Sequence, residues 1–173
     1  MKALSRLLSL IALTLLSGCL SRAPSVKQCY YLEAPIPPSQ GAVPLPAITV
    51  SPVCEGRGVV ILGADAACRT LYWHELAAAP AALIADEFIR RFPAARATPS
   101  PLIAPKFKVL FIGGDSRLPD APKAVCEVVM TYSGKRLLVR KEVPLENRTI
   151  PDLVRGMGVA LGLVFEEYAR FAQ

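Results

Sequence analysis

The chain contains one histidine, His74, and no two cysteines or histidines at the short spacing of a zinc site. Zinc ligands commonly come in CxxC or HxxxH pairs, so the sequence predicts no metal, and nothing in it indicates another cofactor. A Ser-His-Asp site would have to use His74, but the Gly-x-Ser-x-Gly turn that presents such a serine is missing. We therefore expect no catalytic residues, and we interpret His74, which follows Trp73, as structural.

Carboxylate dyads and nucleic-acid-binding patches are also missing. The acidic pairs Asp86-Glu87 and Glu166-Glu167 are adjacent in sequence, and adjacent residues on a helix do not face each other. We interpret both pairs as solvated faces, and we expect that the protein is not an enzyme. No cluster of Lys and Arg is interleaved with aromatic residues, which argues against nucleic acid as a partner.

The apolar run near the start of the chain is too short to cross a bilayer. It covers Leu7–Leu16, whereas a transmembrane helix needs about twenty residues. Met1–Arg6, which precedes it, carries two positive charges. A charged start, a short apolar core and small residues at a cut site are typical of a signal peptide, which we place at residues 1–18.

Leu16-Ser17-Gly18-Cys19 ends this leader and resembles the lipobox of bacterial lipoproteins. In that chemistry the cysteine thiol accepts a diacylglyceryl group, and the small residues before it let the peptide enter the peptidase. The new amino group of the cysteine is usually acylated too, and several acyl chains anchor a protein more firmly than one. We therefore predict lipidation of Cys19. The alternative is a secreted protein in which this cysteine occurs by chance.

After cleavage, 155 of the 173 residues remain, which is enough for one domain with its own core. We expect a lipidated tether at residues 19–28 and a folded domain at residues 29–173. Leu20, rather than aspartate, follows the cysteine, which favours the periplasmic side of the outer membrane over the inner membrane. The net charge falls from +6 to +4 without Lys2 and Arg6. This excess fits either weak attraction to anionic headgroups or a solvated surface without a partner.

Apolar periodicity and turn residues divide the domain into two sets of strands, each followed by a helix. The first set is expected at 29–32, 47–53, 59–62 and 68–73, with a proline-rich loop at 33–46 and the last three strands in a small antiparallel meander. The second set is expected at 107–112, 125–132 and 137–143, with a turn beginning at 113–115 and a hairpin at Ser133-Gly134-Lys135.

The helices are expected at about 74–92, with Pro80 in the first turn of its main part, and from Thr149, the N-cap, to Ala172. Their apolar faces comprise Leu76, Leu83, Ile84 and Phe88 in the first, and Leu153, Met157, Leu161, Val164, Tyr168 and Phe171 in the second. The order strands-helix-strands-helix predicts an α+β fold with two layers, in which both amphipathic helices pack on a largely antiparallel sheet.

Four further cysteines, Cys29, Cys54, Cys68 and Cys126, follow Cys19. An even number in an oxidising compartment permits disulfides. Cys54 and Cys68 flank the meander and form the most plausible pair, while Cys29 and Cys126 are expected on strands that could be neighbours. The alternative is four buried free thiols.

Gly158 and Gly162 share one face of the last helix, where each glycine costs up to about 1 kcal/mol. This cost indicates the close approach of another backbone. Either the domain's own sheet or another subunit could provide it.

The order of these features resembles the ABC-type transport auxiliary lipoproteins, which include the paraquat-inducible C-type lipoproteins. The resemblance covers residues 19–172. It rests on the lipobox, Tyr30-Tyr31-Leu32, the proline-rich loop, Gly58-Val59-Val60-Ile61, Arg69-Thr70-Leu71-Tyr72-Trp73 running into a helix, and the closing hairpin and helix.

The resemblance implies a non-catalytic docking or assembly subunit that works at the outer membrane with an MCE-domain protein and the subunits of an ABC transporter in lipid transport. It leaves open whether the chain forms a homo-oligomer. The alternative is an envelope assembly lipoprotein that helps to insert lipopolysaccharide or outer-membrane proteins.

Overall fold

The computed structural model describes residues 27–33, 37–39, 41–97 and 104–173. Its strands are β1 (Gln28–Tyr30), β2 (Ala47–Val50), β3 (Gly58–Leu62), β4 (Cys68–Leu76), β5 (Lys106–Asp115), β6 (Lys123–Tyr132) and β7 (Lys135–Pro144). Its helices are the 3-10 turn η1 (Pro52–Cys54), α2 (Pro80–Arg91) and α3 (Ile150–Phe171). The predicted signal peptide, the lipidation site Cys19 and most of the tether lie outside the described residues.

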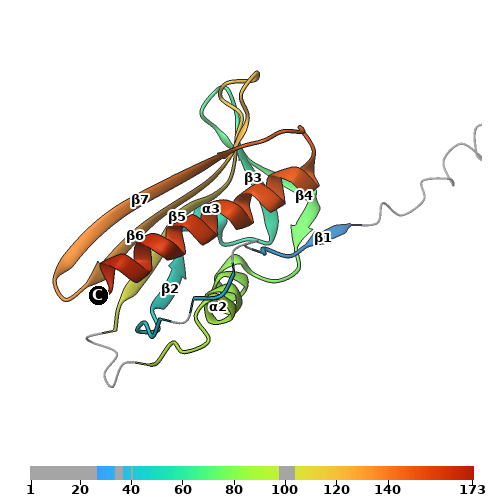
Figure 1. The fold of residues 1–173 in the computed structure, drawn as a ribbon. Coiled ribbons are helices and arrows are strands. Elements are labelled where there is room, and N and C mark those ends of the chain that lie inside the picture. The colour runs from blue at the N-terminus through green and yellow to red at the C-terminus, as the bar shows by residue number, and fades with distance from the viewer. Residues whose placement is uncertain (1–26, 34–36, 40, 98–103) are drawn as a thin grey trace, which may run out of the picture.

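These strands belong to one mixed sheet in the order β1-β4-β3-β5-β6-β7, with β2 beside the first half of β5 (Figure 1). The pairs β3–β4, β5–β6 and β6–β7 are antiparallel, whereas β1–β4, β2–β5 and β3–β5 are parallel. The α+β class and the mostly antiparallel pairing are confirmed. The parallel pairs depart from the predicted sheet.

β2 and β3 form one interrupted strand along β5. β2 pairs with the start of β5 and β3 pairs with the end of β5, and η1 lies between β2 and β3. In the gap the Sγ atom of Cys54 lies 3.4 Å from the amide nitrogen of Ile112, which thereby finds a partner. The predicted antiparallel meander is therefore wrong. β2 and β3 run in the same direction along β5, and only β3 and β4 form an antiparallel pair.

Both helices share one hydrophobic core with the sheet (Figure 1). The ring of Phe88 on α2 lies 5.2 Å from that of Phe165 and 5.3 Å from that of Tyr168, both on α3. Pro80 occupies the first turn of α2, as predicted, but Leu76 ends β4 instead of belonging to the helix. A proline suits the first turn because its missing amide hydrogen has no intrahelical partner there.

The local signals of the second half are confirmed. Thr149 caps α3, since its side-chain oxygen accepts a hydrogen bond from the amide of Asp152 at 3.3 Å. Ser133 and Gly134 adopt φ angles of 49° and 77°, as the tight hairpin between β6 and β7 requires. The predicted turn at 113–115 is instead the end of β5, whose glycines allow close packing. A Cβ at Gly113 would collide with the carbonyl of Val60.

The sheet face away from the helices carries an ion-pair network. Arg140 of β7 donates to Glu127 and Glu142, both at 2.8 Å, and to Asp115 at 3.3 Å. Val125 lies on the same face, since it pairs with Glu142, and yet it is fully buried. We infer that the aliphatic parts of these charged side chains cover it.

This network predicts a loss of stability in acid. The hydrogen bond from Arg117 lowers the pKa of Asp115, and that from Lys123 lowers the pKa of Glu142. A carboxylate with a lowered pKa stabilises the fold above its unfolded-state pKa, and this contribution is lost as the pH falls through its folded-state value. We expect the free energy of unfolding, measured in urea, to decrease below about pH 4.

The variant Arg140→Met should show a smaller decrease, because its carboxylates have lost their shared partner before any acid is added. Arg136→Met, on the same strand but outside the network, should keep the wild-type pH dependence. Equal pH dependence of the two variants would contradict the role of the network.

Within the part of the chain that the structure covers, neither long helix has both the length and the apolarity that crossing a bilayer requires.

Candidate functional site

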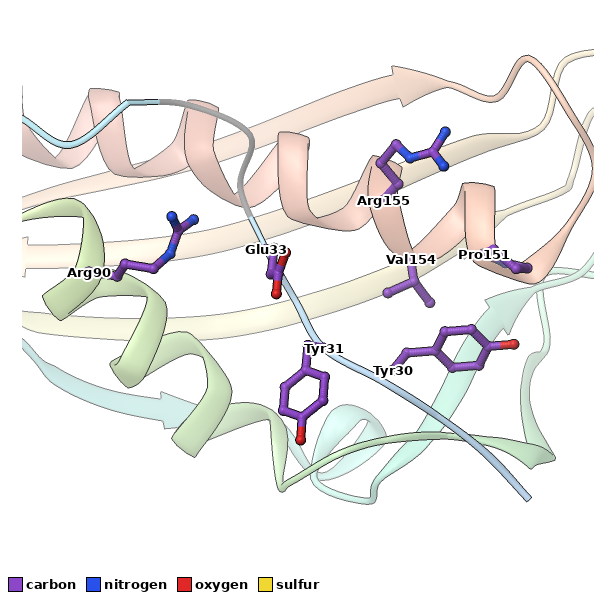
Figure 2. Close-up of a pocket in the computed structure, with 7 residues that line it drawn as sticks. All are labelled: Tyr30, Tyr31, Glu33, Arg90, Pro151, Val154 and Arg155. Carbon is purple, nitrogen blue, oxygen red and sulfur yellow. The ribbon is translucent and has the colours of Figure 1, made fainter. Parts of the chain in front are cut away.

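Residues 27–33, the N-terminal segment, form one wall of a surface pocket of about 440 Å³ (Figure 2). α2 and the first turns of α3 form the other walls. We call it the N-terminal pocket, and its lining residues are Tyr30, Tyr31, Glu33, Arg90, Pro151, Val154 and Arg155. Two guanidinium groups, a carboxylate and two phenols beside an apolar patch suit the binding of a polar segment that also carries apolar atoms.

The N-terminal segment is held by alternate side chains. The hydroxyl of Tyr30 donates to the side-chain oxygen of Gln28 at 2.6 Å and lies 3.2 Å from Nδ1 of His74. Leu32 is buried in the core, whereas Tyr31, between them, is 67% exposed. Tyr30 and Leu32 therefore fix the segment, whereas the side chain of Tyr31 remains available to a partner. His74 contacts Tyr30, at a ring-centroid distance of 5.9 Å.

The N-terminal segment also crosses α3 in close contact. A Cβ at Gly158 would collide with the carbonyl oxygen of Glu33. The backbone that approaches Gly158 is therefore the chain's own N-terminal segment. Both predicted alternatives, the sheet and another subunit, differ from this. The sheet is approached by Gly156 instead, whose Cβ would lie 2.8 Å from that of Ala124.

Arg90 is positioned by a buried carboxylate. Glu87 is 4% exposed and accepts two hydrogen bonds from the Arg90 guanidinium, at 2.6 and 2.8 Å. This contact raises the pKa of Arg90. The prediction of a solvated Glu87 is wrong, because the residue lies on the face of α2 that carries Leu83, one turn earlier, into the core.

The second acidic pair lies in partly exposed ion pairs. Glu166 is 3.5 Å from Arg91, and Glu167 accepts a hydrogen bond from Lys141 of β7 at 2.7 Å. These contacts join α3 to α2 and to the sheet, and the two acidic side chains have different partners.

A second pocket, of about 460 Å³, lies at the N-terminal end of α3, beside the β3–β4 and β5–β6 connections. Its apolar lining includes Ile61, Leu145, Ile150 and Leu153, and its charged lining residues are Arg69, Asp115, Lys123 and Arg148. Each of these charges already has an ion-pair partner. Arg90 and Arg155 of the N-terminal pocket have ion-pair partners too. We regard the N-terminal pocket as the better candidate because Tyr30 and Tyr31 of the Tyr-Tyr-Leu motif line it.

The predicted Cys54–Cys68 disulfide is not formed in the structure, where Cys29, Cys54, Cys68 and Cys126 are free thiols. Cys54 belongs to the core beneath the helices, whereas Cys68 is exposed and pairs with Leu62 on the other face of the sheet. Cys29 and Cys126 are not on neighbouring strands, since β4, β3 and β5 separate β1 from β6.

A thiol count tests this arrangement. We expect Cys29 and Cys68, which are exposed, to react with a thiol reagent in the folded protein, and Cys54 and Cys126 to react only after unfolding. Burial raises the pKa of both inner thiols, which lowers their reactivity further. Mass spectrometry of the labelled peptides distinguishes the alternatives. A protein in which Cys54 and Cys68 both react only after unfolding and reduction, while Cys29 reacts without reduction, would contain the bridge.

No family model and no curated protein matches the chain. Solved structures share its fold, including two crystal structures. A crystal structure of a Xanthomonas campestris protein, described by the family model DUF330, has a TM-score of 0.65 at 12% identity over 82% of this chain and 92% of that one. The crystal structure of an uncharacterized protein has a TM-score of 0.63 at 14% identity over 86% and 99%. The chain therefore has the fold of a DUF330 protein of known structure.

Proposed function

We propose that the protein is a membrane-anchored periplasmic component of an MCE/ABC-type lipid transport system, and that it acts at the outer membrane as a non-catalytic docking subunit. One observation carries the proposal. The Tyr30-Tyr31-Leu32 segment, on which the resemblance to the transport auxiliary lipoproteins rests, also forms a wall of the N-terminal pocket. The fold shared with the DUF330 structure supports the same assignment at the level of architecture.

The pocket offers a docking site for a short segment of the partner. The Arg155 side chain is 72% exposed, and its contact with Asp152 is long, at 3.5 Å. Because Arg155 is exposed and the contact is long, this pair contributes about 1 kcal/mol or less. A carboxylate of the partner can therefore replace Asp152, whose own side chain is 12% exposed, at little cost. Val154 and Pro151 offer an apolar contact beside it. We infer that the partner presents an acidic residue next to an apolar one.

Co-purification of the full lipidated chain from native membranes tests the proposal. We expect an MCE-domain protein and ABC transporter subunits to be recovered with it, and Arg155→Glu to reduce their recovery. Arg170→Glu is the matched control. Arg170 lies on the same helix, is 70% exposed, and has an ion pair of the same spacing with Glu167.

Two results would contradict the proposal. Recovery of an outer-membrane β-barrel in place of these partners would favour the envelope assembly role. Recovery of the lipidated chain alone would exclude docking under these conditions.

A further inference from the structure

Two large aromatic side chains are exposed at one edge of the sheet. Trp73 of β4 is 60% exposed and Tyr31, which follows β1, is 67% exposed. Trp73 is the only tryptophan of the chain. β1 is the outermost strand at this side, and β4 is its neighbour (Figure 1). We call the surface here the tether edge and define it by Lys27, Cys29, Tyr31, Arg57, Trp73 and Glu75.

Strand register places these residues on one side. Cys29 pairs with Glu75, and the ammonium of Lys27 bonds to the Glu75 carboxylate at 2.5 Å. The intervening residues point the other way, where the rings of Tyr30 and His74 meet. The pairing continues past β1, since the amide of Ala77 donates to the carbonyl of Tyr30 at 2.7 Å. Side chains alternate along an extended chain, so Tyr31 belongs to the side of Lys27. Trp73 lies where the register of β4 to β3 shifts, between Leu71 and Glu75, and its exposure places it at the surface of this edge.

The length of the tether keeps this edge close to the acyl chains. Lys27 is eight residues after Cys19, so an extended tether reaches roughly 28 Å. α3, with 22 residues, is about 33 Å long. The tether is therefore shorter than the domain, so Lys27 and the strand edge beside it stay within about 28 Å of the anchored cysteine. This step rests on the lipid anchor of the proposed function.

The composition of the tether edge suits lipid headgroups. Tryptophan and tyrosine prefer the boundary between water and hydrocarbon, because their rings are apolar and their polar atoms need hydrogen bonds. Lys27 and Arg57 carry two positive charges against the single carboxylate of Glu75, to which both lie close. A surface of this kind is attracted by anionic phospholipids.

We propose that the tether edge lies on the bilayer that holds the acyl chains, with Trp73 and Tyr31 among the headgroups and Lys27 and Arg57 near anionic phosphates. The lipid anchor then fixes the orientation of the domain as well as its location. Because Tyr31 also lines the N-terminal pocket, this arrangement brings the pocket close to the membrane surface.

Trp73 itself reports the contact, since the chain has no other tryptophan. The full lipidated chain is placed in vesicles of phosphatidylethanolamine and phosphatidylglycerol, with or without bromine on the acyl chains. We expect the Trp73 emission to shift to shorter wavelength and most of its intensity to be lost with brominated lipid. Tyr31→Ser should restore much of the intensity. Leu138→Ser, which alters a side chain 59% exposed on β7, should not.

Each outcome is decisive for one claim. Emission that is shifted but not quenched means that protein, such as a second copy of the chain, covers the tether edge. Emission that is neither shifted nor quenched means that Trp73 stays exposed to water. Either result overturns the proposal. Quenching that persists unchanged without phosphatidylglycerol overturns its anionic part. Mass spectrometry of the same preparation tests Cys19 separately, so failure of the anchor is distinguishable from failure of the surface contact.

Discussion

Replacing Phe165 with alanine is expected to lower the free energy of unfolding by about 3 to 5 kcal/mol. Phe165 has no exposed surface, and its ring lies 5.2 Å from that of Phe88, 6.3 Å from that of Phe92 and 5.8 Å from that of Phe107. Phe88 belongs to α2, Phe92 directly follows that helix, and Phe107 belongs to β5. The cavity cannot close by the movement of one element, because the remaining rings are held from different sides.

Denaturation in urea, followed by circular dichroism, measures this loss. Ile89→Ala is a suitable control, since Ile89 is 52% exposed on α2 and should change the stability by less than about 0.5 kcal/mol. If Phe165→Ala cost no more than this control, the two helices and the sheet would not share the core that we describe.

Gly158→Ala is expected to lower the free energy of unfolding by about 2 kcal/mol. Helix propensity alone predicts the opposite, a gain of about 1 kcal/mol, because alanine is the better helix former. The sign of the effect therefore decides whether the Glu33 carbonyl contacts α3 as closely as the structure shows. Displacement of the segment should also open the N-terminal pocket and expose residues 27–33 to protease.

Gly56→Ala provides the control for the glycine substitution. A Cβ at Gly56 would meet nothing within 4 Å, so its stability should stay within about 0.5 kcal/mol of the wild type. Urea denaturation and limited proteolysis of both variants test the contrast. A stabilised Gly158→Ala protein with an intact N-terminal segment would contradict the crossing.

Local physical signals in the sequence suffice for much of the fold. The cap at Thr149, the tight turn at Ser133-Gly134 and the proline in the first turn of α2 each depend on neighbouring residues, and all three are confirmed. The buried face of α3 follows from its apolar period, with Leu153, Met157, Leu161, Val164 and Tyr168 all buried.

Long-range pairing could not be predicted in the same way. In the sequence, β2 and β3 look like two strands of a hairpin because Gly56 lies between them and Gly58 begins β3. Both strands nevertheless pair with β5. Their direction depends on a strand that follows about fifty residues later in the chain. The predicted Cys54–Cys68 pair depends on the same assumption about the neighbours of β2 and β3, whereas in the structure Cys54 is buried and Cys68 is exposed.

The candidate site was only partly visible in the sequence. The Tyr-Tyr-Leu motif is visible in the sequence, but its position against α3 is not. Arg90 and Arg155 were not predicted to line a pocket, because the elements that carry them are far apart in sequence. The spacing of Glu87 and Arg90 was the one available signal, since residues three apart on a helix can form an ion pair.

The crossing of α3 by the N-terminal segment has a consequence for the order of assembly. Ribosomes make residues 27–33 among the first of the domain and α3 last, so the segment must wait, without its binding site, until the whole chain is present. The hydrogen bond from Tyr168 to the carbonyl of Pro44, which joins residues 124 apart, has the same dependence. Contacts of such long sequence separation form slowly. A chain truncated before residue 150 would leave both early segments without a place to bind.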